Sequence, residues 1–245
     1  MLFDWPEEDG RRDDVSHGKN SDGAEALAAL PADILARYEV FSYRNAARIL
    51  QGSFPAQYDE IIAALRRLTI TRRMIRSPGG SKSEIARYID GLFDPGWQET
   101  RIIGDLTVRL VSAKGETEFS RYTRQGYLDG HRIDFVKGRV ALDLEWNSKD
   151  QTYDRDLSAF AAFYHAGAID LGVIITRGSA MNNDFFRGLG KVLDKDGREG
   201  AGEVYRKYGA STTWMGKLLY RLDAGRNGGC PVLAIGLTPA CVSGD

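Results

Sequence analysis

Hydrophobic residues recur at two spacings along the chain, and the change of spacing divides it into elements. Between residues 24 and 76 they repeat every three or four positions, which predicts mostly helical structure. Pro31 is expected to divide the first helical set, because proline suits a first helical turn and disrupts an interior. The helical repeat consists of Ala24, Leu27, Leu30, Ile34, Leu35, Tyr38, Tyr58, Ile61, Ile62, Leu65 and Leu68.

After a break at residues 77–80, strand patterns join the helical ones. Ser83 is expected to cap a short helix that ends near Phe93. Two short strands are expected to turn at residues 137–139, and the apolar run 171–176 predicts a strand buried on both faces. Further strands are predicted at 106–111 and 231–237, and further helices at 154–165, 201–208 and 213–222.

This order of elements indicates the fold class. From Ser83 to Thr176 it is helix, three strands, helix, strand, which predicts an α/β or α+β protein with a central mixed sheet flanked by helices. We expect a disordered or loosely attached acidic tail over residues 1–23 and a helical N-terminal region over 24–76. Residues 77–245 are expected to form the core.

Composition adds little and excludes little. The 33 Lys and Arg residues nearly balance 34 Asp and Glu residues, which neither demands nor rules out a nucleic-acid partner. Cys230 and Cys241 lack the spacing of a disulfide framework or a zinc site, so free thiols are expected. With no apolar run near the ~20 residues of a membrane span and no signal pattern, we expect a cytoplasmic protein without a membrane partner.

Three carboxylates interrupt the apolar sequence around the predicted turn: Asp134, Asp143 and Glu145. On a strand, Asp143 and Glu145 point to the same face, and an unpaired buried carboxylate is costly. A divalent metal would remove that cost, with Asp134 and Asp143 as ligands, the Leu144 carbonyl as another, and Glu145 orienting or deprotonating water. Pairing with neighbouring Arg or Lys side chains is the competing interpretation.

The chain resembles the PD-(D/E)XK nuclease superfamily and, more narrowly, the BglII/BstYI family of type II restriction endonucleases. The resemblance covers roughly residues 80–240 and is strongest over 131–178. It rests on Ile133-Asp134-Phe135 followed by Asp143-Leu144-Glu145, on Trp146-Asn147-Ser148-Lys149-Asp150, on Tyr153-Asp154-Arg155-Asp156-Leu157 and on Gly172-Val173-Ile174-Ile175-Thr176-Arg177-Gly178.

This resemblance implies an active site built on Asp134, Asp143 and Glu145. Most relatives carry lysine at the position of Glu145, although the BglII-like group tolerates Gln or Glu there. A third acid at this position could instead bind or position metal, as a further ligand or for a second ion. Lys149 is either a surface lysine or a replacement for the missing one near the scissile phosphate. Glu84 is either a further catalytic acid or an ordinary acid at a helix N-terminus.

The implied activity is hydrolysis of double-stranded DNA at a short palindrome by metal-activated water, with one or two Mg²⁺ ions per site. A homodimer and a cognate DNA methyltransferase are the implied partners. A related repair or defence nuclease, or a non-catalytic DNA-binding module on the same fold, are the alternatives.

DNA contacts are expected from two loops, near 176–184 and 221–229, and from residues 211–213. Each of these residues is otherwise an ordinary polar loop residue. Arg and Asn side chains suit base edges, and hydroxyl groups suit phosphates. The candidates are Arg177, Ser179, Asn182, Asn183, Ser211, Thr212, Thr213, Arg226 and Asn227.

Overall fold

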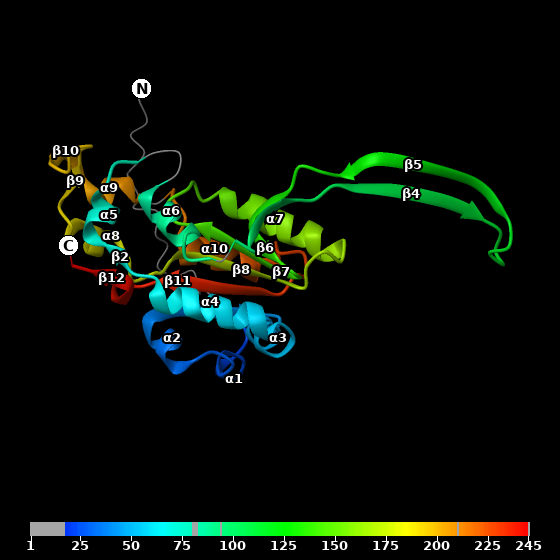
Figure 1. Cartoon of the computed structure of the whole chain (residues 1–245), viewed down its shortest axis with the longest axis horizontal. Helices are drawn as coiled ribbons and strands as arrows, with labels where there is room; N and C mark the ends of the chain where they lie inside the picture. Colours follow the sequence, from blue (N-terminus) through cyan, green and yellow to red (C-terminus); the bar gives the residue numbers. More distant parts are fainter. Residues whose placement is uncertain (1–17, 80–82, 94, 210, 245) are drawn as a thin grey trace, which may run out of the picture.

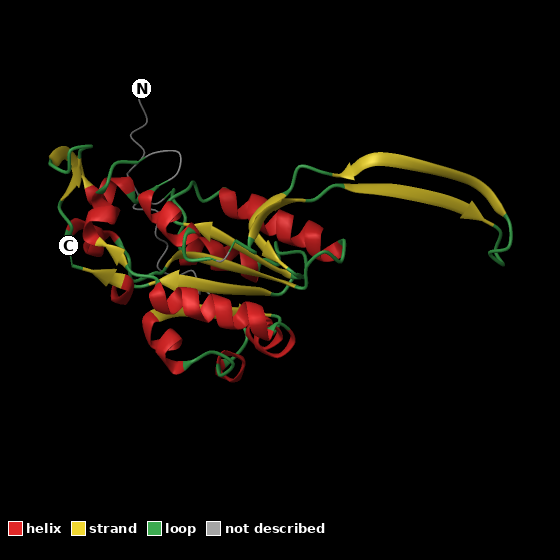
Figure 2. Ribbon diagram, viewed as in Figure 1, coloured by secondary structure: helices red, strands yellow, loops and turns green. Residues whose placement is uncertain are grey.

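A six-stranded mixed sheet forms the centre of the computed structural model, which describes residues 18–79, 83–93, 95–209 and 211–244 (Figures 1 and 2). Its strand order is β1-β11-β8-β7-β6-β3. The strands are β1 (Tyr38–Tyr43), β3 (Gln98–Arg101), β6 (Arg132–Lys137), β7 (Val140–Glu145), β8 (Leu171–Arg177) and β11 (Val232–Leu237). β7, β8 and β11 run parallel, and β1, β6 and β3 are antiparallel to their neighbours.

The three parallel strands are buried along their whole length, as continuous apolar runs predict for a sheet covered on both faces. One apolar core contains side chains from the N-terminal helices, including α3 (Ala46–Ser53) and α4 (Pro55–Arg67). The other contains side chains from α7 (Thr152–His165) and α10 (Met215–Asp223). Figure 1 shows these two helix pairs on opposite faces of the sheet.

The N-terminal region is mostly helical, as predicted, but it also supplies an edge strand. Besides α3 and α4 it contains α1 (Ala24–Leu27), α2 (Ala32–Arg37), the short strand β2 (Ile70–Thr71) and α5 (Arg72–Arg76). Residues 38–43 were expected to continue the helical pattern and instead form β1, paired with β11. Pairing with β11 overrides the local helical pattern in this segment, and its aromatic and β-branched residues fit a half-buried strand well. The region is therefore joined to the main sheet.

The first described residues are bound to the body of the protein. The backbone N–H groups of Gly18, Lys19 and Asn20 donate to the Asp223 carboxylate at 3.0, 3.2 and 3.1 Å. The predicted loosely attached tail therefore does not extend to residue 23, and residues 1–17 lie outside the described part of the chain.

A long two-stranded ribbon extends away from the sheet (Figures 1 and 2). It consists of β4 (Gly104–Val111), where a strand was predicted, and β5 (Glu118–Leu128), which was not. Most of its side chains are exposed. The hydrophobic-run pattern missed β5 because polar and charged residues occupy most of its positions.

Smaller elements complete the chain. They are α6 (Glu84–Asp90), α8 (Asn183–Arg187), β9 (Lys191–Leu193), β10 (Glu199–Glu203), α9 (Val204–Lys207), the 3-10 helix η1 (Pro239–Cys241) and β12 (Val242–Ser243). Ser83 caps α6 as predicted, its hydroxyl accepting a hydrogen bond from the Ala86 N–H at 3.0 Å. The helix expected at 201–208 is shorter, since β10 occupies its first residues. Cys230 and Cys241 are free and buried, and no described helix is long and apolar enough to cross a membrane.

Candidate active site

The hairpin β6–β7 brings Asp134 and Asp143 opposite each other. Its register pairs Phe135 with Leu142, and the turn lies at residues 138–139 as predicted. The backbone N–H of Asp134 donates to Asp143 Oδ1 at 2.8 Å, and the N–H of Leu144 donates to Asp134 Oδ2 at 3.5 Å. The sequence pattern therefore located two acids that the fold does bring together.

Asp143 and Glu145 are buried polar residues with unused bonding capacity. They are 3% and 4% exposed, and neither Asp143 Oδ2 nor Glu145 Oε2 has a hydrogen-bond partner among the described residues. Burial of a carboxylate without compensation is costly, so such oxygens indicate a site completed by a bound group.

Helix α7 adds a fourth acid, Asp156, which was not predicted as a site residue. It is 2% exposed and its Oδ2 atom also lacks a partner among the described residues. The helical spacing contained the signal. Tyr153, Asp156, Leu157 and Phe160 follow positions i, i+3, i+4 and i+7 and so share the inward face. A carboxylate on the buried face of a helix is costly unless a bonding partner compensates its charge, so Asp156 belongs with the candidate site residues.

Burial makes these four carboxyl groups weaker acids. It raises the pKa of Asp143 well above its usual value, and the carboxylates of Asp156 and Asp134 add to this rise. Burial, with Glu145 beside it, raises the pKa of Asp156 to about 8. Burial also raises the pKa of Glu145, and desolvation raises the pKa of Asp134, which lies at the exposed edge of the group.

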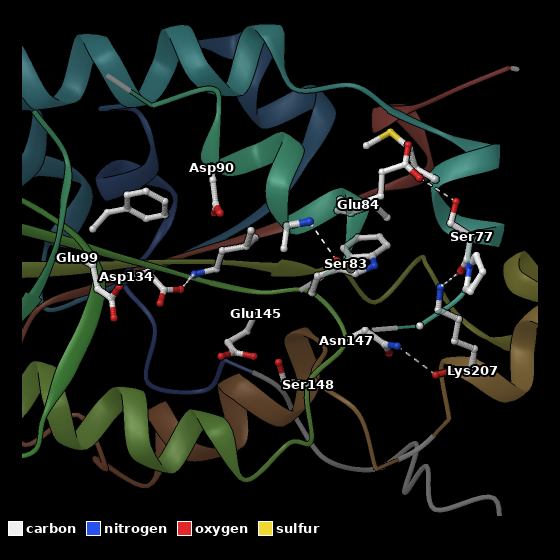
Figure 3. Close-up of a pocket in the computed structure, with 18 of the residues that line it drawn as sticks. Ser77, Ser83, Glu84, Asp90, Glu99, Asp134, Glu145, Asn147, Ser148 and Lys207 are labelled. Atoms are coloured by element: carbon white, nitrogen blue, oxygen red, sulfur yellow. Dashed lines mark hydrogen bonds between the residues drawn. The ribbon is translucent and has the colours of Figure 1, made fainter. Parts of the chain in front are cut away.

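Asp134 and Glu145 line a cavity of about 500 Å³ that opens beside the hairpin (Figure 3). Glu84, Asp90 and Glu99 contribute three more acidic side chains to its wall. The negative charges of Asp90 and Glu99 also raise the pKa of Asp134, because nearby like charges disfavour its ionised form.

Glu84, predicted as either a further catalytic acid or an ordinary acid at a helix N-terminus, lies in the wall of this cavity. Its Oε2 atom accepts a hydrogen bond from the Ser77 hydroxyl at 2.8 Å. Lys149 is exposed and does not line the cavity; its segment forms a β-bridge with Thr212. The lysine found in the wall is Lys207, from α9. Its ammonium group donates to the Ser77 and Ile75 carbonyls at 2.6 and 3.1 Å, and burial lowers its pKa to about 8.

Three of the predicted DNA-binding residues lie close together: the buried Arg177 and its bonding partners Thr212 and Thr213. Arg177 is 2% exposed, and its Nε donates to the carbonyls of Thr213 and Trp146 at 2.9 and 3.1 Å. Its Nη2 donates to the Thr212 hydroxyl at 2.6 Å. Arg177 and the fully buried Thr213 therefore hold the segment before α10 against β7 and β8. Ser211, which precedes them, is exposed.

The other predicted DNA contacts are spread over separate loops. Asn227 is 3% exposed and bonds the Cys230 carbonyl, while Arg226 pairs with Asp154 at 2.6 Å. The Asn182 side chain caps α8 by accepting from Asp184 and Phe185, and the Ser179 hydroxyl donates to Glu39 at 2.9 Å. Asn183 is half-buried in the first turn of α8. Sequence alone could not separate structural from exposed loop residues, because side-chain burial depends on distant elements.

A divalent cation is the group that the hairpin oxygens suit best. Carboxylate and carbonyl oxygens are the ligands of hard cations, and two buried carboxylate oxygens here lack a partner. Within the described residues, however, no three His, Cys, Asp or Glu side chains already converge on one point as a metal-binding group. The predicted ligands Asp134, Asp143, Leu144 and Glu145 therefore remain a proposal.

A mixed sheet flanked by helices, with acids at the open end of the β6–β7 hairpin, defines a restriction-endonuclease-like α/β protein. A family model described as restriction endonuclease BglII/BglIII matches residues 38–237. The chain thus belongs to the BglII-type restriction endonuclease family, whose activity is site-specific cleavage of DNA. No curated protein gives a significant match. The family and the fold class predicted from the sequence are confirmed.

Proposed function

We propose that this protein is a Mg²⁺-dependent type II restriction endonuclease that cuts double-stranded DNA at a short palindrome. The main support is the pair of buried carboxylate oxygens without partners, on Asp143 and Glu145, beside an open cavity. Asp134, Asp143 and the Leu144 carbonyl would hold the ion. When bound, the ion polarises a phosphoryl oxygen and lowers the pKa of water.

Glu145 would act as the general base. Its Oε2 atom is available to accept the proton of the attacking water, and burial raises the pKa of Glu145, which makes its carboxylate a stronger base. The water oxygen forms a bond to phosphorus, and one P–O ester bond of the DNA breaks. Glu84 and Lys149 are further proposed catalytic residues, and the position of Glu84 in the cavity wall supports the first more than the exposed Lys149 supports the second.

The partners follow from a palindromic substrate. A symmetric homodimer would present one acidic cavity to each strand, and a cognate DNA methyltransferase would protect the host sites. Of the predicted DNA-binding residues, Ser179, Asn183 and Ser211 have exposed or half-buried side chains outside the ion pairs, helix cap and buried contacts described above, and the contact of Ser179 with Glu39 is itself exposed. These three residues are the more suitable candidates for DNA contact.

Incubation of the purified protein with unmethylated phage DNA and Mg²⁺ tests the proposal. Discrete fragments, lost in chelator and in Asp143→Ala while DNA binding is retained, are the expected result. A smear would favour a repair or defence nuclease acting on other DNA forms. Binding without cleavage under any divalent metal would favour a non-catalytic DNA-binding module.

A further inference from the structure

One arginine lies directly against the buried acids of the candidate active site. Arg155, in the first turn of α7, donates from Nε and Nη2 to Asp156 Oδ1 at 3.0 and 2.9 Å. The same Nη2 atom lies 3.5 Å from Glu145 Oε1. The guanidinium group therefore spans an acid of strand β7 and an acid of helix α7.

The two sides of this arginine have opposite environments. The Arg155 side chain is 67% exposed, whereas the side chains of Glu145 and Asp156 are 6% and 2% exposed. Among the described residues, none bonds the Nη1 atom of Arg155, and the residue lines the cavity beside the hairpin. One edge of a planar, permanently charged fork is thus fixed, and the remainder faces the space that a ligand would enter.

The charge of the cavity makes this geometry consequential. The described residues of its wall include five acids, Glu84, Asp90, Glu99, Asp134 and Glu145, and two cations, Arg155 and Lys207. Unless a bound cation offsets them, these acids repel a phosphate diester that approaches Glu145, since like charges at close range oppose each other even near a protein surface.

The second cation is committed elsewhere. Lys207 donates to the Ile75 and Ser77 carbonyls and interacts with Glu84. Figure 3 shows Lys207 and Ser77 on one side of the cavity and Asp134 and Glu145 on the other. Arg155 is therefore the cation whose charge lies beside the proposed catalytic acids.

We propose that Arg155 is a further catalytic residue, whose free guanidinium edge binds a non-bridging oxygen of the phosphate that is cut, while Asp156 acts as its positioning residue. This inference rests on the proposed endonuclease function. Arginine suits the task because its fork gives charge-assisted hydrogen bonds to phosphate oxygens. Developing negative charge on those oxygens during cleavage strengthens the contact, and so the contact favours the transition state.

A purely structural role is the alternative, in which Arg155 only neutralises Glu145 and Asp156. Both roles predict slower cleavage when the arginine is replaced, so activity alone does not separate them. Direct coupling between Arg155 and one particular phosphate separates them, because a structural arginine weakens the site whatever charge that phosphate carries.

The first experiment measures single-turnover cleavage of a duplex containing the mapped site. Arg155→Gln is expected to slow cleavage about 100-fold, as loss of one preorganised donor to a developing charge does. Arg155→Lys keeps the charge and is expected to retain part of the rate. Arg139→Gln is the matched control, since Arg139 is another exposed arginine paired with an acid, Asp170, at the turn end of β7. It is expected to cut at the wild-type rate.

The second experiment measures DNA binding with Ca²⁺ and a duplex that stays intact during the measurement. Replacing the scissile phosphate by a neutral methylphosphonate should weaken wild-type binding about tenfold more than it weakens Arg155→Gln. Arg139→Gln should lose as much affinity as wild type. Equal losses for wild type and Arg155→Gln would overturn the inference, and so would a wild-type cleavage rate in Arg155→Gln.

The results that would contradict the role of Arg155 differ from those that would contradict the endonuclease function. If wild type cuts DNA and the Arg155 variants behave like wild type, this inference is wrong and the endonuclease function stands. If wild type cuts no DNA with any divalent metal, the proposed function is wrong and the inference is overturned with it. If Arg155→Gln fails to fold, as circular dichroism would show, Arg155→Lys decides through the same methylphosphonate comparison. A wild-type-sized loss contradicts the contact, because lysine lacks the planar fork that bonds Asp156 through one edge and the phosphate through the other.

Discussion

Asp156, the buried acid that α7 packs beside the β6–β7 hairpin, links the protonation of a single residue to the stability of the fold. Burial, with the nearby Glu145, raises the pKa of Asp156 to about 8, far above that of an ordinary aspartate. Between pH ~4 and ~8 the folded protein therefore holds a proton that the unfolded chain releases. The free energy of unfolding must fall as the pH rises through this window.

We expect the melting temperature of metal-free protein in chelator to fall as the pH is raised from 5 to 8. Asp156→Asn should make that dependence shallower, because its side chain cannot release a proton, while the other buried acids still contribute. Added Mg²⁺ should raise the melting temperature more at pH 8 than at pH 5, since carboxylate ligands bind metal in the deprotonated form. A melting temperature that rises from pH 5 to 8 in chelator would contradict this account.

Some residues of the candidate site could be predicted from the sequence, and others could not. Asp134, Asp143 and Glu145 could be found because acids in apolar strand sequence are conspicuous, and two strands joined by a tight turn must pair. Asp156 was passed over because a helical acid is usually solvated, although its spacing from Leu157 placed it inward. Lys207 could not be predicted, since α9 is far from the hairpin in sequence and only the folded chain brings it to the cavity wall.

Helix α7 positions two of the site residues, and its distance from the sheet depends on one glycine. A Cβ atom on Gly172, in β8, would lie 2.2 Å from two ring atoms of Phe160 in α7. Cβ atoms do not approach other atoms so closely, so a larger residue here must displace the Phe160 ring or push the helix away from the sheet. If the helix moves, Arg155 and Asp156 move with it.

Gly172→Ala is expected to destabilise the protein by about 1–3 kcal/mol, the usual range for overpacking a core. Gly52→Ala, in α3, is the matched control: nothing lies within 4 Å of its added Cβ. Because alanine favours helix over glycine by up to about 1 kcal/mol, that variant should be as stable as wild type or more so. Denaturant titration of both variants measures the difference, and equal stabilities would refute the packing argument.

The ribbon β4–β5 is expected to be dispensable for folding of the core. None of its residues belongs to either buried apolar cluster, and an isolated two-stranded ribbon contributes little stability of its own. Replacing residues 109–121 by Asn-Gly would retain the Val108–Tyr122 pair and close it with a tight turn. The melting temperature should stay within about 3 °C, a shift worth roughly 1 kcal/mol for a chain of this size. A larger loss would mean that the ribbon supports the core.

Elements were predictable where local pattern and long-range pairing agree. The buried runs that became β8 and β11 are apolar throughout, and α7 follows helical spacing. β1 and β5 were missed for physical reasons: β1 is defined by its partner β11, and β5 pairs with β4 outside the core, where no buried face imposes alternation.

The whole molecule is proposed to act as a pair of identical subunits with one cutting site per DNA strand. A dimer that contains one wild-type and one Asp143→Ala subunit should therefore cut one strand and leave the other intact. We expect wild-type protein re-associated with an excess of the variant to convert supercoiled plasmid mainly to open circles. Linear product in the same proportion as wild type alone would show that the sites do not act one per strand.

The buried thiols have a practical consequence for the extended ribbon. Burial raises the pKa of Cys230 to about 12 and also raises that of Cys241, so neither side chain presents a reactive thiolate to solvent. A cysteine introduced in place of Lys114, in the exposed turn between β4 and β5, would then be labelled selectively by a maleimide dye. The natural sequence thus already offers a background suited to spectroscopic distance measurements between a ribbon tip and bound DNA.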